Sequence, residues 1–181
     1  ATTASSSLTV WRAPAPTGCI VNASQGAPGA TVGRISGRVV LEGERPEVKP
    51  LDIPAEKSKG CSADDKTIDN TDQTLLIDKD GGVKNVVVSV ETADGKVVVP
   101  EKPIELDQAS CHYEPHVLVI PAGSTVSFKN SDSIGHNVHT TADRNPSFNE
   151  MVPPGGARQE KYDKADRVRV PCDVHPWMGA W

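Results

Sequence analysis

The sequence Cys172-Asp173-Val174-His175-Pro176-Trp177-Met178 lies near the C-terminal end of this chain of 181 residues. Within it a thiol, an imidazole and a thioether recur at intervals of three residues. Sulfur ligands combined with imidazole are typical of copper centres that carry out electron transfer. The heptapeptide therefore indicates a redox metal site, and the rest of the chain has to provide a fold that presents it.

The spacing of these side chains argues against a helix. On a helix they would share one face but extend over about 9 Å of axis, which is too far for one ion. Pro176 also disfavours a helix, because it moves His175 out of the α region of backbone conformation. Pro171 stiffens the entrance to the segment. We therefore predict a tight loop that supplies three ligands, with a fourth from elsewhere in the chain.

The composition and the apolar pattern favour short strands joined by turns. Glycine and proline number 15 each, and aromatic residues make up only 4% of the chain. Alternation of residues on two faces predicts a first strand at 35–41. Further strands are predicted at 75–77, 83–90, 97–99, 104–106, 117–120, 125–130, 137–140, 159–162 and 168–170. Turn signals such as Gly81-Gly82 and Asp94-Gly95 separate them, so we predict an all-β sandwich or barrel.

Residues 1–33 differ from the rest in composition. They are mostly Ala, Ser, Thr, Gly and Pro, with Arg12 as the only charged residue. Such a segment cannot bury enough apolar surface to fold alone. We predict a flexible arm, or one that lies on a partner through Trp11, followed by one domain at 34–181. Residues 34–110 of that domain form a strand-rich first half, and 111–181 carry the metal ligands.

Charge and hydropathy exclude some classes of function. The net charge is −5, and no cluster of lysine and arginine is interleaved with aromatic residues, so a nucleic-acid partner is not expected. No apolar run approaches the roughly 18 residues of a membrane-spanning helix. The opening Ala1-Thr2-Thr3-Ala4 fits a mature product whose export signal has been removed, although a shortened chain would begin the same way. We expect a periplasmic or extracellular protein.

The four cysteines permit disulfides without requiring them. If Cys172 holds a metal, the preferred bridge joins Cys61 to Cys111 and leaves Cys19 over. The alternative is a protein of a reducing compartment, in which the remaining cysteines are buried thiols.

His136 is the best candidate for the fourth ligand, because it follows a predicted strand and a polar turn. The sequences Phe128-Lys129-Asn130 and His136-Asn137-Val138, followed by Cys172-x-x-His175-x-x-Met178, resemble those of the cupredoxins, the small blue-copper proteins. The chain is most similar to cupredoxin-like domains of exported bacterial proteins whose copper loop reads Cys-Asp-Val-His-Pro-Trp-Met. The specific part of the resemblance covers residues 111–181.

This resemblance implies a Greek-key β-sandwich that binds one copper ion. It implies that His136, Cys172 and His175 are strong equatorial ligands and that Met178 is a weak axial one. Two imidazoles, a thiolate and a distant thioether also describe a blue-copper centre on chemical grounds.

The resemblance also assigns roles to neighbours of these ligands. It implies that Asn137 ties the two ligand loops together by hydrogen bonds. It implies that electrons leave through the imidazole edge of His175, inside an apolar collar of Pro176 and Trp177. Trp177 fits equally well as a residue that fills the end of the core.

Two features lie outside the basic pattern. Cupredoxins have a final strand after the copper loop, whereas this chain reaches Trp181 three residues after Met178. We therefore expect this strand to be missing or to be supplied by another segment or subunit. The other histidines are His112, His116 and His139. Of these, His116 and His139 are candidates for a second metal site or for a replacement ligand, and all three have hydrogen bonding or surface exposure as the structural alternative.

The leading hypothesis is an electron carrier, not an enzyme, in which copper cycles between Cu(II) and Cu(I). Its partners would be redox proteins such as cytochromes or a membrane-bound electron-transfer complex, and the polar arm suggests a subunit of a larger redox assembly. A copper carrier or storage module and a structural zinc site in a β-sandwich are the alternatives. A copper oxidase or nitrite reductase is disfavoured, because five histidines cannot provide a trinuclear cluster.

Overall fold

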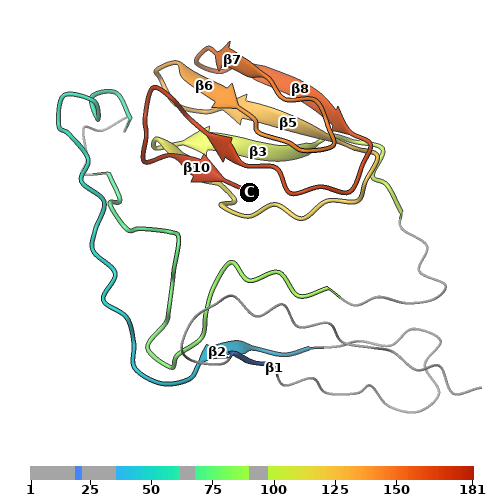
Figure 1. The fold of residues 1–181 in the computed structure, drawn as a ribbon. Coiled ribbons are helices and arrows are strands. Elements are labelled where there is room, and N and C mark those ends of the chain that lie inside the picture. The colour runs from blue at the N-terminus through green and yellow to red at the C-terminus, as the bar shows by residue number, and fades with distance from the viewer. Residues whose placement is uncertain (1–18, 22–35, 62–67, 90–97) are drawn as a thin grey trace, which may run out of the picture. The chain divides into compact units, whose positions relative to one another are not determined.

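A computed structural model describes residues 19–21, 36–61, 68–89 and 98–181 (Figure 1). These residues form two compact units. The first contains 19–21, 36–49 and 72–89, and the second contains 50–61, 68–71 and 98–181. The predicted boundary between an arm at 1–33 and a domain from residue 34 lies outside the described residues and stays a prediction.

The first unit is built around a short antiparallel pair, β1 (Cys19–Val21) and β2 (Val39–Leu41). The predicted strand at 35–41 is thus confirmed at its C-terminal half. The predicted strands at 75–77 and 83–90 are wrong for the described residues, which retain only an isolated bridge between Ile77 and Val83. Val86, Val87 and Val88 are 46–56% exposed, so this apolar run has no sheet against which to pack.

The second unit contains a four-stranded sheet in the order β4-β3-β5-β8. Its strands are β3 (Ile104–Ala109), β4 (His112–Glu114), β5 (Ser124–Asn130) and β8 (Ala157–Tyr162). Strands β3 and β5 run parallel, and the other neighbours are antiparallel. Figure 1 shows β3, β5 and β8 side by side.

Two further antiparallel pairs complete this unit. One joins β6 (His136–His139) to β7 (Asn149–Val152), and the other joins β9 (Val170–Pro171) to β10 (Gly179–Ala180). The core lies between these pairs and the four-stranded sheet, because buried residues from every strand of this unit form one cluster. Its members in these strands are Leu106, Tyr113, Val126, Phe128, Val138, Val152, Tyr162, Val170 and Ala180. The described residues thus confirm the all-β prediction.

A short strand follows the heptapeptide, which corrects the expectation that it is missing. The strand is β10, which spans two residues and pairs with β9. The amide of Trp181 also donates to the carbonyl of His116 at 3.0 Å, and the amide of Leu118 donates to the carbonyl of Trp181 at 2.8 Å. Residues 117–120 form no strand, so that prediction is wrong. The backbone of Leu118 nevertheless bonds to the last residue after β10.

Strands β4 and β7 were not expected from the sequence. Strand β7 carries Asn149, Glu150 and Met151, which are exposed, and only Val152 points into the core. Pairing with β6 along its whole length holds it in place.

The described part of the chain contains no helix with the length and hydropathy of a membrane span.

A disulfide joins Cys61 to Cys111, which confirms the predicted bridge. It attaches the segment at 50–61 to the turn between β3 and β4. Next to it, Ser133 Oγ donates to the carbonyl of Gly60 at 3.0 Å. The segment therefore packs against the turn that precedes β6.

Gly60 provides a test of this packing. Its φ is +84°, and a Cβ there would lie 2.5 Å from Ile134 Cγ2. Gly155 has a φ of +69° but open space around it. We expect Gly155→Ala to lower the free energy of unfolding by about 1–2 kcal/mol, the cost of the left-handed backbone. Gly60→Ala should cost about 1–3 kcal/mol more, because it also overpacks the contact with Ile134.

Denaturant unfolding of both variants measures the difference. Equal losses in the two variants would contradict the close packing of the segment on the turn at Ile134.

Candidate metal centre

Two elements bring the predicted ligands together. Strand β6 begins at His136, and the heptapeptide forms the connection from β9 to β10. The amide of Cys172 donates to the carbonyl of Met178 at 3.2 Å, and the amide of Met178 donates to the carbonyl of His175 at 2.9 Å. These bonds close the loop on itself, which confirms the predicted tight loop.

Four buried side chains with metal-binding chemistry lie at this end of the unit, one on β6 and three in the loop between β9 and β10. His136, Cys172, His175 and Met178 are each 3% exposed or less. The two imidazoles face each other, with Nδ1 of His136 2.8 Å from Nδ1 of His175. Cys172 Sγ lies 3.9 Å from the same nitrogen of His175. The donor atoms of His136, Cys172 and His175 all lie within 4.8 Å of one another.

These distances fit a single metal ion. Imidazole nitrogen binds an ion such as zinc at about 2.0 Å, and thiolate sulfur binds it at about 2.3 Å. Two nitrogens on one ion can therefore lie up to about 4 Å apart, and a nitrogen and a sulfur up to about 4.3 Å. The separations of 2.8 Å and 3.9 Å satisfy both limits.

The electrostatics of the centre favour a thiolate. Burial raises the pKa of the Cys172 thiol, but hydrogen bonds with His136, His175 and the backbone lower it to about 6. Burial lowers the pKa of His136, but hydrogen bonds with Asp132 and Cys172 raise it to about 9. The neighbouring imidazoles thus ease the loss of the thiol proton. Binding of a metal at these residues would release a proton.

Asn137 connects the two ligand-bearing elements. Its Oδ1 accepts hydrogen bonds from Cys172 Sγ at 3.2 Å, from the amide of Asp173 at 2.7 Å and from the amide of Val174 at 3.2 Å. Its Nδ2 donates to Asp173 Oδ2 at 3.1 Å and to Asn149 Oδ1 at 2.7 Å. The prediction that Asn137 ties the ligand loops together is confirmed.

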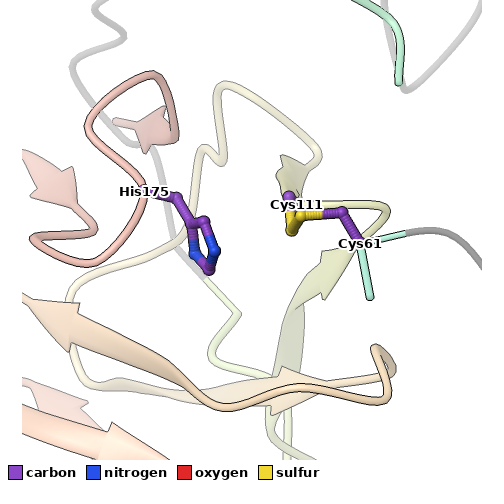
Figure 2. Close-up of side chains that lie close together, drawn as sticks. All are labelled: Cys61, Cys111 and His175. Atoms are coloured by element: carbon purple, nitrogen blue, oxygen red, sulfur yellow. A yellow bond between two sulfur atoms is a disulfide. The ribbon is translucent and has the colours of Figure 1, made fainter. Parts of the chain in front are cut away.

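A second group of donors lies beside this centre. Cys61, Cys111 and His175 also have their donor atoms within 4.8 Å of one another, and Figure 2 shows the disulfide beside the His175 ring. Because the two sulfurs are bonded to each other, they are not thiolate donors. The disulfide instead covers the outer side of the ligand histidines, with Cys111 Sγ 3.9 Å from His136 Nε2.

Residues 100–179 match the family model of copper-binding proteins of the plastocyanin/azurin family. Over these residues the chain is similar to the cupredoxins, the family of blue-copper proteins. Among curated protein sequences, none matches the chain.

Solved structures similar to part of this chain include three of different kinds. A mutant of amicyanin in its Cu(I) state is 26% identical, with a TM-score of 0.40, and the match covers 43% of this chain and 77% of amicyanin. A purple cupredoxin from Nitrosopumilus maritimus is 23% identical, with a TM-score of 0.37 and coverage of 42% and 93%. A copper-containing nitrite reductase from Thermus scotoductus is 23% identical, with a TM-score of 0.41 and coverage of 50% and 24%.

The other three histidines of the segment at 100–179 have places outside the centre. His112, His116 and His139 belong to none of the donor groups found in the described part of the chain. His112 Nδ1 lies 2.9 Å from the carbonyl oxygen of Ser110. His139 Nδ1 lies 3.0 Å from Asp173 Oδ1, at the outer side of the copper loop. His136 and His139 thus face opposite ways, as strand alternation predicts.

The edge of His175 is less open than the sequence suggested. The residue is 3% exposed, and its ring centroid lies 5.1 Å from that of Trp177. Trp177 is half-buried against the core, and its Nε1 donates to the carbonyl of Cys111 at 3.1 Å. Trp177 therefore serves both predicted roles, since it borders the histidine and fills the end of the core. The exposed part of the loop at 172–178 consists of Asp173, Val174 and Pro176.

Sequence reasoning missed one residue of the candidate centre, Asp132. Its Oδ2 lies 2.8 Å from His136 Nε2, and its side chain is only 7% exposed. The signal in the sequence is an aspartate four residues before a ligand histidine, but the surrounding Asn130-Ser131-Asp132-Ser133 fits an ordinary polar turn equally well.

The role of Asn137 can be tested without metal. We expect Asn137→Ala to lower the free energy of unfolding by about 2 kcal/mol or more, because each donor left unpaired costs about 1–3 kcal/mol. Asn149→Ala is the comparison variant. It removes the partner of Asn137 Nδ2 and a bond to Asp173, but it leaves Asn137 Oδ1 as the acceptor of the loop amides, so it should cost less than Asn137→Ala.

Urea unfolding gives both values. Hydrogen exchange at the amides of Asp173 and Val174 should accelerate in Asn137→Ala. Unchanged exchange at these two amides would show that the side-chain amide of Asn137 does not hold the loop.

Proposed function

We propose that this cupredoxin is an electron carrier with one copper ion held by His136, Cys172, His175 and Met178. The observation that carries the proposal is the pair of Nδ1 atoms 2.8 Å apart, with a buried thiol 3.9 Å from one of them. The family assignment makes copper the metal, and two imidazoles with a thiolate and a thioether suit copper in electron transfer.

When bound, copper supplies a one-electron change between Cu(II) and Cu(I). The side chains contribute a site whose shape is set before the metal arrives. Asn137 Oδ1 fixes the amides of Asp173 and Val174 beside Cys172, and Tyr113 Oη lies 3.2 Å from the carbonyl oxygen of Asn137 and 3.4 Å from that of Pro171. Because these contacts belong to the protein alone, the ligands need to move little as the charge of the centre changes. Burial of all four ligands also keeps water away.

Electron exchange is proposed to occur at the copper loop. Val174 is 43% exposed and Pro176 is also exposed, and both flank the buried His175. A redox protein that docks there would approach the ligand through Trp177 or the loop backbone, not through a free imidazole edge. Cytochromes or a membrane-bound electron-transfer complex remain the proposed partners. A larger assembly is proposed only from the N-terminal arm, of which the structure describes residues 19–21.

An exported location is part of the proposal. The disulfide between Cys61 and Cys111 supports it, because such bonds persist in oxidising compartments. The periplasm is the proposed compartment.

The decisive experiment is the visible spectrum of the 181-residue chain after addition of Cu(II). We expect an intense thiolate charge-transfer band that saturates at one copper ion per chain and disappears in Cys172→Ser. A colourless protein that binds one zinc ion tightly would instead establish a structural zinc site. Uptake of several copper ions without an intense band would establish a carrier or storage role.

The axial role of Met178 generates a separate prediction. Met178→Leu conserves volume at a site that is 1% exposed, so the fold and the intense band should persist. The reduction potential should rise, because a weak donor to Cu(II) is lost and the axial ligand tunes the potential.

The matched control is Met151→Leu, since Met151 is 60% exposed on β7. A spectroelectrochemical titration of the three proteins compares the potentials. If both variants keep the native potential, Met178 is a packing residue and not a ligand.

A further inference from the structure

Asp132 holds the ligand histidine from the side opposite to the proposed metal. Its carboxylate lies 2.8 Å from Nε2 of His136, whereas Nδ1 of the same ring faces His175. An N–H at Nε2 leaves the lone pair of Nδ1 available for a metal. Hydrogen bonds from the outer nitrogen of a ligating histidine to a carboxylate fix the ring and raise its basicity.

The carboxylate is itself held by the backbone of the turn between β3 and β4. The amide of Ser110 donates to Oδ1 at 2.5 Å, and the amide of Cys111 donates to Oδ2 at 2.8 Å. The amide of Asp132 in turn donates to Asn130 Oδ1 at 3.0 Å. Asp132 therefore has a defined orientation that does not depend on His136.

The turn that holds Asp132 has an unfavourable backbone. Ser110 and Cys111 are the two central residues of the hairpin, and their φ angles are +51° and +54°. Positive φ at both positions is typical of a type I′ turn, which prefers Asn-Gly. For other residues the left-handed conformation costs about 1–2 kcal/mol each. Here it directs two consecutive amides at one carboxylate, and the disulfide at Cys111 anchors it.

We propose that Asp132 is a positioning residue that fixes His136 with Nδ1 toward the copper and stabilises Cu(II) relative to Cu(I). The negative charge of the carboxylate acts on the copper through the imidazole, so it favours Cu(II), the more highly charged ion. The Ser110–Cys111 turn and the disulfide provide the rigid support for this carboxylate. The inference rests on the proposed copper site and adds the group that sets its preference between the two oxidation states.

The test compares Cu(II) and Cu(I) affinities of the whole chain in Asp132→Asn. Loss of a carboxylate that bonds a ligating histidine lowers metal affinity by about 10- to 100-fold. We expect this loss for Cu(II) and a smaller one for Cu(I), so that the reduction potential rises. Asp132→Glu should restore part of the native ratio, because it returns a carboxylate.

Asp107→Asn is the matched control. It removes the same charge from a carboxylate of the same region, where Oδ2 of Asp107 accepts from Ser131 Oγ at 2.7 Å without any contact to a ligand. Its affinities and potential should stay native. If Asp132→Asn behaves like Asp107→Asn, or weakens both oxidation states equally, the inference is overturned.

A second measurement needs no variant and covers the case in which Asp132→Asn fails to fold. In the NMR spectrum of the Cu(I) protein, the Nε2 proton of His136 should be shifted downfield and exchange slowly. A fast-exchanging proton without that shift overturns the inference. Failure of the native chain to bind copper would refute the proposed function itself, whereas native copper binding with an unshifted potential in Asp132→Asn refutes only the role of Asp132.

Discussion

The amides of Asp173 and Val174 donate hydrogen bonds to one side-chain oxygen, Oδ1 of Asn137, and Cys172 Sγ lies 3.2 Å from the same atom. A two-residue hairpin stem, β9 with β10, is too short to define a seven-residue loop by itself. The shared acceptor fixes the thiol end of the loop to β6. Since Asn137 follows His136 directly, the same contact determines the distance between the first histidine and the cysteine.

Burial makes this geometry chemically useful. The thiol and the imidazoles lie where water does not compete, so that their mutual hydrogen bonds bring the pKa of Cys172 down to about 6 despite the cost of desolvation. The disulfide also helps to exclude water, because it places two apolar sulfurs beside the histidines. The segment at 50–61 is thereby part of the centre, although the family model begins at residue 100.

The parts of the fold that the sequence predicted are those with a local signal. Strand β5 alternates with Val126 and Phe128 inward, and the loop is marked by Pro171 and Pro176. The two apolar residues of strand β7, Met151 and Val152, are adjacent and do not alternate with polar residues. Pairing with β6 holds the strand, so no pattern within 149–152 could indicate it. The opposite error occurred at 83–90, where an apolar run suggests a strand but stays exposed in the described residues.

The residues of the candidate site also differ in whether the sequence carries a local signal for them. The family motif could indicate His136, Cys172, His175 and Met178, since each has a side chain with metal-binding chemistry at a recognisable spacing. Asp132 could not be separated from a common turn aspartate, because its role depends on amides of Ser110 and Cys111, which are 21–22 residues away in sequence. A strained non-glycine turn is retained where long-range contacts compensate for it. The carboxylate of Asp132 and the disulfide at Cys111 are the long-range contacts that compensate for the type I′ geometry at Ser110–Cys111.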